Sequence, residues 1–318
     1  MSFYVAISMN QIKLPPFLQP GDRIGIVAPA SVIRYDDILG GIDIFTNKWG
    51  LKVTEGETLK TAFNQFSASD EIRRNDLQRM LDDPGINAII AARGGYGCSR
   101  IVDGLNFDRF LQHPKWIVGF SDLTVLLSQV YQLGYASLHA PMAKSITTYG
   151  SEKAEESLRQ FLFGELPEYS VDAYHLNKTG KVTAPVVGGN LCILNHLIGT
   201  KTEIDFTGKI LFIEDINEYL YNLDRMVIQM KRAGKLEGLA GLVVGQFTDM
   251  KDNSAPTFGK DANEIIHEHI AEYNYPVCFN FPVGHVGDNR AMGVGMPAQL
   301  NVTSETARLQ FLPVPTSI

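Results

Sequence analysis

The sequence is poor in cysteine and tryptophan and has no long apolar run. Only three of its 318 residues are cysteine and two are tryptophan. Cys98, Cys192 and Cys278 are odd in number and far apart, so they predict neither a disulfide framework nor a CxxC zinc pair. No uninterrupted apolar stretch reaches the roughly 18 residues of a membrane span, so we expect no membrane partner.

An excess of positive charge is also missing. The chain has 28 Lys and Arg against 35 Asp and Glu, a net charge of −7, which disfavours nucleic acid and anionic membranes as partners. Residues 1–17 lack a basic region and are interrupted by Lys13 and Pro15–Pro16, which favours a short tail over a secretory signal. We therefore expect a cytoplasmic protein.

The order of apolar segments predicts an α/β layer fold. Short apolar runs at 23–28, 86–92 and 116–120 indicate buried strands, with helical segments between them, as in parallel βαβ units. A polar stretch without a clear period follows and predicts a linker. The expected organisation is a domain at 1–165, a linker at 166–183 and a smaller α/β domain at 184–318, with a hairpin near the C-terminus.

The sharpest local signal is Gly119-Phe120-Ser121-Asp122-Leu123-Thr124. A strand ends there, a tight corner carries Ser121, and a helix begins at once. The free amides and dipole of a helix start favour developing negative charge, which suits a nucleophilic serine. The segment is similar to the nucleophile elbow of hydrolases, although the second glycine of G-x-S-x-G is absent. The alternative is that Ser121 only caps the helix.

A glycine-rich turn, Ala92-Arg93-Gly94-Gly95-Tyr96-Gly97, follows another predicted strand. Paired glycines let backbone amides approach a ligand closely, as in an oxyanion hole or a phosphate cradle. The spacing does not match G-x-G-x-x-G or a P-loop, which disfavours a nucleotide site and a nicotinamide dehydrogenase. A plain tight turn is the alternative.

Two further segments carry acid–base groups. Glu214 and Asp215 end the apolar run 210–213, where they could orient another group or form the acidic first turn of the next helix. His285 lies in a glycine-containing loop and has the most open setting of the seven histidines, with His139 as its one competitor. No H-E-x-x-H motif or Asp/His cluster occurs, so we expect no metal.

Ser121, Glu214 and His285 have complementary chemistry. A histidine base can take the proton of a serine hydroxyl, and a carboxylate can fix the imidazole tautomer. These motifs, together with Gly188-Gly189-Asn190-Leu191 and Pro282-Val283-Gly284-His285, follow one another in an order and spacing that resemble the LD-carboxypeptidase family of serine peptidases. The resemblance covers roughly residues 14–312.

The resemblance implies a flavodoxin- or glutamine-amidotransferase-like N-terminal domain and a smaller C-terminal α/β domain. It implies Ser121 as nucleophile, His285 as general base and Glu214 as the residue that orients it. Backbone amides of Gly95 and Asp122 would form the oxyanion hole. The family uses no cofactor, is commonly dimeric, and cuts murein tetrapeptides between an L-centre and a terminal D-alanine. Candidate substrate-binding residues within these motifs are Arg93, Gly94, Tyr96 and Arg290, with surface salt bridges as the alternative for the two arginines.

Two other functions remain open at this stage. Some members of the family hydrolyse peptide-nucleotide antibiotics of the microcin C type, where we expect aromatic residues to hold the base. Segment 169–185 offers only Tyr169 and Tyr174, which favours a murein peptide. A two-lobed binding protein without catalysis is the other alternative.

Overall fold

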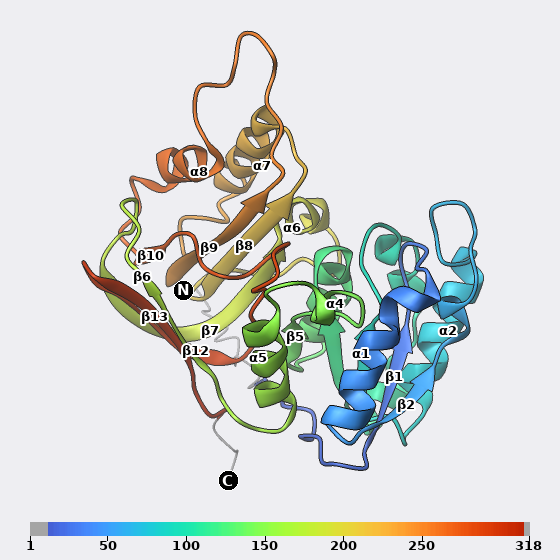
Figure 1. Ribbon diagram of the computed structural model, residues 1–318. Coiled ribbons are helices and arrows are strands. Elements are labelled where there is room, and N and C mark those ends of the chain that lie inside the picture. The colour runs from blue at the N-terminus through green and yellow to red at the C-terminus, as the bar shows by residue number, and fades with distance from the viewer. Residues whose placement is uncertain (1–11, 315–318) are drawn as a thin grey trace, which may run out of the picture.

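The computed structural model describes residues 12–314. The tail predicted at the N-terminus lies largely outside this range. The chain forms two β-sheets that lie side by side, each with helices packed against it (Figure 1). The mixed α/β architecture predicted from the sequence is confirmed. No helix within the described range is long and apolar enough to cross a membrane.

The N-terminal sheet has six strands in the order β2–β1–β3–β4–β5–β11. The first five are parallel to one another, in the order typical of flavodoxin-like folds. β1, β3 and β4 are almost entirely buried, which explains their continuous apolar sequences. The strands are β1 (Arg23–Val27), β2 (Lys52–Glu55), β3 (Ala88–Ala91), β4 (Trp116–Gly119), β5 (Ser137–His139) and β11 (Met292–Val294).

The helices of this half separate the strands as the sequence predicts. The first helical segment consists of consecutive 3-10, α- and π-helical turns over Tyr35–Lys48. Ser69 caps the next helix by accepting a hydrogen bond from the Ile72 N–H at 3.3 Å. The α-helices are α1 (Leu39–Asp43), α2 (Asp70–Asp82), α3 (Asp108–Gln112), α4 (Thr124–Gln132) and α5 (Glu152–Leu162).

The C-terminal sheet has seven strands in the order β10–β9–β8–β7–β12–β13–β6. β7 to β10 are parallel, whereas β12, β13 and β6 add to β7 in antiparallel fashion. The predicted terminal hairpin is β12–β13. The strands are β6 (Glu168–Asp172), β7 (Gly180–Asn190), β8 (Ile210–Ile216), β9 (Gly241–Thr248), β10 (Val277–Cys278), β12 (Pro297–Val302) and β13 (Thr306–Phe311), and the helices are α6 (Leu191–Leu197), α7 (Leu220–Arg232) and α8 (Ala262–Ile270).

The structure differs from the predicted domain division in two places. Residues 166–183, predicted to be a linker, contain β6 and the start of β7, and β6 looks polar because it is the edge strand of its sheet. The second difference is β11, which follows the His285 loop but pairs antiparallel with β5, so that Met292 lies opposite His139. A strand from the last part of the chain therefore completes the N-terminal sheet.

Candidate active site

Ser121 lies at the corner where β4 passes into α4. Its φ of +63° is in the left-handed region, which a residue with a Cβ adopts at a cost in energy. The short 3-10 turn Ser121–Leu123 has Phe120 at its N-cap position and no side-chain capping bond, so the capping alternative for Ser121 is wrong. The strained corner matches the geometry expected of a nucleophile elbow.

The glycine-rich turn after β3 packs directly against this corner. A Cβ placed on Gly94 would lie 2.9 Å from the Ser121 Cβ and 3.2 Å from its Oγ, so only glycine allows the approach. Gly95 has a φ of +110° and is exposed. Among the hydrogen bonds of residues 12–314, none uses the backbone N–H of Gly95 or of Asp122. Both predicted oxyanion donors are therefore free of partners within the described chain.

His285 and Glu214 form a hydrogen-bonded pair that is partly buried. His285 Nδ1 lies 2.7 Å from Glu214 Oε2, and the Glu214 side chain is fully buried near the end of β8. With Nδ1–H donating to the carboxylate, Nε2 carries the lone pair and faces away from Glu214. The His285 ring also packs edge-on against Phe120, the neighbour of Ser121, with ring centroids 4.9 Å apart. This contact places the histidine ring beside the residue that precedes Ser121.

The surroundings of His285 set its protonation. Burial alone would lower the pKa of His285, but the charge and hydrogen bond of Glu214, with a contribution from Asp215, raise it above the ordinary 6.5. A raised pKa means that Glu214 stabilises the imidazolium, the form that a histidine adopts after accepting a proton.

Asp215 has a separate task, because successive side chains of a strand point to opposite faces. Its carboxylate accepts hydrogen bonds from Asn190 Nδ2 at 2.8 Å and from the Cys192 N–H at 2.9 Å. Burial and the neighbouring Glu214 raise the pKa of Asp215 to about 7. The carboxylate ties β8 to the start of α6, so the alternative of an acidic first helical turn is wrong for this pair.

His139, the competing histidine, is fully buried beneath the pair. Its ring lies between Phe120 and Phe212, with centroids 5.7 and 5.0 Å away. Neither ring nitrogen has a hydrogen-bond partner among the described residues. Burial, with the charge of His285, lowers the pKa of His139 to about 4 despite the opposing effect of Glu214. A buried neutral imidazole of this kind is unsuited to exchange protons with a substrate.

The predicted substrate-binding residues have different surroundings. Arg290 is paired with Asp288 through Nε at 3.1 Å and Nη2 at 2.9 Å, so its guanidinium is already occupied. Arg93 donates Nη1 to the Val32 carbonyl at 3.0 Å and has no acidic partner within 12–314. Tyr96 is about half exposed on the glycine-rich turn.

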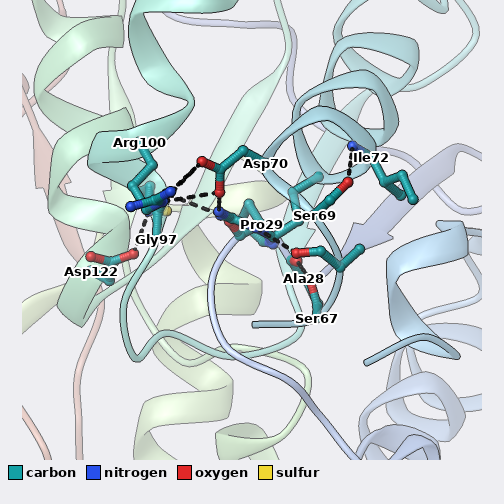
Figure 2. A network of polar contacts seen from close by, with 12 residues as sticks. Ala28, Pro29, Ser67, Ser69, Asp70, Ile72, Gly97, Arg100 and Asp122 are labelled. Carbon is teal, nitrogen blue, oxygen red and sulfur yellow. Dashed lines mark hydrogen bonds and ion pairs between the residues drawn. The ribbon is translucent and has the colours of Figure 1, made fainter. Parts of the chain in front are cut away.

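The sequence points to the backbone N–H of Asp122, but it gives no role to the Asp122 side chain. Its carboxylate is buried and accepts a hydrogen bond from the Cys98 N–H at 2.8 Å (Figure 2). The partners are 24 residues apart, so no local sequence signal points to the contact. Within the described residues, no group of three or more His, Cys, Asp or Glu side chains is placed to hold a metal ion.

A strained serine beside a hydrogen-bonded His–Glu pair and two unpaired backbone amides is the arrangement of a serine-type hydrolase. Comparison with known families makes this specific. Residues 24–140 match the N-terminal domain of LD-carboxypeptidases, and residues 183–300 match the C-terminal domain. The chain belongs to the LD-carboxypeptidase family, and it is a serine-type carboxypeptidase.

Individual relatives agree with this assignment. A probable murein peptide carboxypeptidase of Bacillus subtilis is 33% identical over 93% of this chain and 94% of its own length. The crystal structure of muramoyltetrapeptide carboxypeptidase from Oxalobacter formigenes has a TM-score of 0.81 and 29% identity, covering 92% of this chain and 100% of that one. MccF, solved in complex with glutamyl sulfamoyl guanosine, shares the fold, with a TM-score of 0.84 at 18% identity over 96% of this chain and 100% of its own.

The fully buried His139 and the partly buried His285 should titrate differently. We expect His285 to titrate above pH 6.5 and His139 to stay neutral from pH 5 to pH 9, as measured by NMR of labelled imidazoles. Glu214→Gln removes the anion that stabilises the imidazolium, so it should lower the pKa of His285. A His285 signal that titrates below pH 6.5, or does not move in Glu214→Gln, would contradict this electrostatic account.

Proposed function

We propose that this enzyme releases the terminal D-alanine from murein tetrapeptides. The observation that carries the proposal is the hydrogen-bonded His285–Glu214 pair beside the Ser121 corner. The names of the Bacillus and Oxalobacter relatives supply the substrate class. The bond to be cut joins the L-centre of the diamino acid to D-alanine.

Each step follows from the roles of the side chains. Ser121 Oγ attacks the carbonyl carbon while His285 Nε2 accepts its proton. The N–H groups of Gly95 and Asp122 hold the oxyanion. The tetrahedral intermediate collapses to an acyl-enzyme as His285 protonates the departing D-alanine nitrogen. Water then attacks the acyl-enzyme by the same route and regenerates the serine hydroxyl.

Removal of the nucleophile provides the direct test. Ser121→Ala should lower kcat for D-alanine release by at least about 10³-fold and abolish labelling by a fluorophosphonate, while tetrapeptide affinity is largely kept. Ser128→Ala, within α4, removes a buried hydroxyl that has no hydrogen-bond partner among the described residues, and it serves as the matched control. If Ser121→Ala kept wild-type turnover, a binding protein or another nucleophile would be the better explanation.

A carboxypeptidase must also recognise the free carboxylate of its substrate, and we assign this role to Arg93. Its Nη2 lies 3.8 Å from where a Cβ on Gly95 would stand, at the turn that presents the proposed oxyanion donor. The carbonyl of Val32 anchors the other end of the guanidinium. In the substrate, the scissile carbonyl and the free carboxylate are separated only by the terminal D-alanine. The oxyanion that forms at this carbonyl and the carboxylate therefore both lie within reach of the glycine-rich turn. Arg290 does not serve here because Asp288 occupies it.

If Arg93 binds the substrate carboxylate, its replacement should reduce the preference for a peptide acid over the corresponding peptide amide. Arg93→Gln should lower kcat/KM for the tetrapeptide with a free carboxylate by about 10- to 100-fold. A loss of this size is typical when a hydrogen bond to a charged group is removed. The substitution should barely affect the same peptide with a C-terminal amide. Arg34→Gln is the control, because it removes a positive charge close to Val32 in sequence from an exposed side chain that is paired with Asp37. It should leave the ratio of kcat/KM for the acid to kcat/KM for the amide unchanged. Equal losses on acid and amide would contradict the role.

The microcin C type of activity is the second candidate, because the fold of MccF is shared. The aromatic residues that segment 169–185 offers are poorly placed to stack on a base. Tyr169 is buried and donates its hydroxyl to the Ala291 carbonyl at 2.7 Å, and Tyr174 lies against His175 and Phe279. A preference for an aminoacyl sulfamoyl adenylate over tetrapeptide in kcat/KM would reverse our choice.

We further propose a cytoplasmic location and a homodimer, as expected for the family. The three cysteines are free, which suits a reducing compartment. Sedimentation of the purified protein at micromolar concentration tests the dimer.

A further inference from the structure

The Asp122 carboxylate joins the serine corner to the glycine-rich turn. Asp122 follows Ser121 and is 1% exposed. Its Oδ2 accepts a hydrogen bond from the backbone N–H of Cys98, which directly follows the glycine-rich turn that contains Gly95. In the proposed mechanism, the backbone N–H of Asp122 is one oxyanion donor and that of Gly95 is the other. One residue thus supplies a donor through its backbone and holds the segment of the second donor through its side chain.

The other hydrogen bonds of the turn run to different parts of the domain. The Ser31 N–H donates to the Gly94 carbonyl, and Ser31 Oγ accepts the Tyr96 N–H at 3.1 Å. Buried Arg73, on α2, donates Nη1 to the Gly97 carbonyl at 3.0 Å. Figure 2 shows Gly97 within this network, with Arg100 and Asp70 on one side and Asp122 on the other. None of these bonds reaches the serine corner, so Asp122 makes the direct polar link between the two donor segments.

We propose that the Asp122 carboxylate is a positioning residue that sets the spacing of the two oxyanion donors. The inference rests on the proposed function, since it assigns both donors. Oxyanion donors must lie 2.7–3.1 Å from the position that the oxygen occupies in the transition state, and loss of one costs about 10²- to 10³-fold in kcat. Steric packing of Gly94 on Ser121 keeps the segments from approaching further, and the Cys98–Asp122 bond keeps them from separating.

The role requires a hydrogen-bond acceptor and not a charge. Asp122 Oδ1 is buried with no partner among the described residues, so only Oδ2 is used. The charged and titratable groups around it are the guanidinium of Arg73 and the thiol of Cys98. Burial raises the pKa of Asp122, which shows that its surroundings do not favour the anion. An asparagine, whose amide oxygen accepts the same N–H, should therefore replace it.

The test compares Asp122→Ala and Asp122→Asn with the wild-type enzyme. Asp122→Ala should lower kcat for D-alanine release by about 10²-fold with KM changed less than about 3-fold, because the oxyanion forms only after binding. The rate of Ser121 labelling by a fluorophosphonate, whose phosphoryl oxygen uses the same donors, should fall in parallel. Asp122→Asn should keep at least one-tenth of both rates. Thermal unfolding of each variant controls for loss of fold.

Two outcomes would overturn the proposal without relying on the alanine variant. One is a loss of more than about 10-fold in folded Asp122→Asn, because the charge would then matter rather than the acceptor. The other is rapid hydrogen exchange of the Cys98 amide in the wild-type enzyme. Wild-type rates in folded Asp122→Ala would overturn it as well. Failure of the proposed function looks different: the wild-type enzyme would release no D-alanine, while fluorophosphonate labelling would still report on the Asp122 variants.

Discussion

The site depends on the fixed junction between the two domains, because the serine comes from one and the His–Glu pair from the other. Thr124 lies three residues after Ser121, and its Oγ1 accepts a hydrogen bond at 3.2 Å from the N–H of Asn190 at the end of β7. The His285 loop begins after β10 in the C-terminal sheet and ends at β11 in the N-terminal sheet. A misplacement of 1 Å between reacting groups can cost about 10²-fold in rate. The loop that carries the proposed base is thus anchored at both ends, one in each sheet.

Electrostatic compensation explains how two carboxylates can be buried at this junction. Glu214 is fully removed from water in an acidic chain and has Asp215 as its neighbour, which is costly unless the charge is compensated. Asp215 is compensated by backbone and amide donors on the other face of β8, whereas Glu214 has the His285 imidazole. The attraction between Glu214 and a protonated His285 is strong because the surroundings are apolar, with Phe120 against the ring. The energy cost of burying Glu214 is therefore offset most fully when His285 carries a proton.

Sequence reasoning recovered the elements whose signals are local. Buried parallel strands have continuous apolar runs, and Ser121, the glycine-rich turn, Glu214 and His285 all follow such runs. What it missed depends on contacts between distant residues. The polar sequence of β6 looks like a linker because the strand is at a sheet edge, and three-residue β11 is too short to reveal its pairing with β5. The Asp288–Arg290 pair is a local contact instead, and it agrees with the salt bridge that the sequence left open for Arg290.

The strand order and the turns that follow it explain why the proposed oxyanion site does not resemble a nucleotide site. In open α/β sheets ligands bind at the carboxyl ends of the strands, where the order reverses, and here this is between β1 and β3. The loops after β1, β3 and β4 carry Ser31, the glycine-rich turn and Ser121 to this edge. A phosphate cradle adds the N-terminus of a helix after the turn. Here short 3-10 turns, Cys98–Arg100 and Val102–Gly104, follow instead. The turn thus offers individual backbone N–H groups rather than a helix terminus, which suits one developing oxyanion better than a phosphate group.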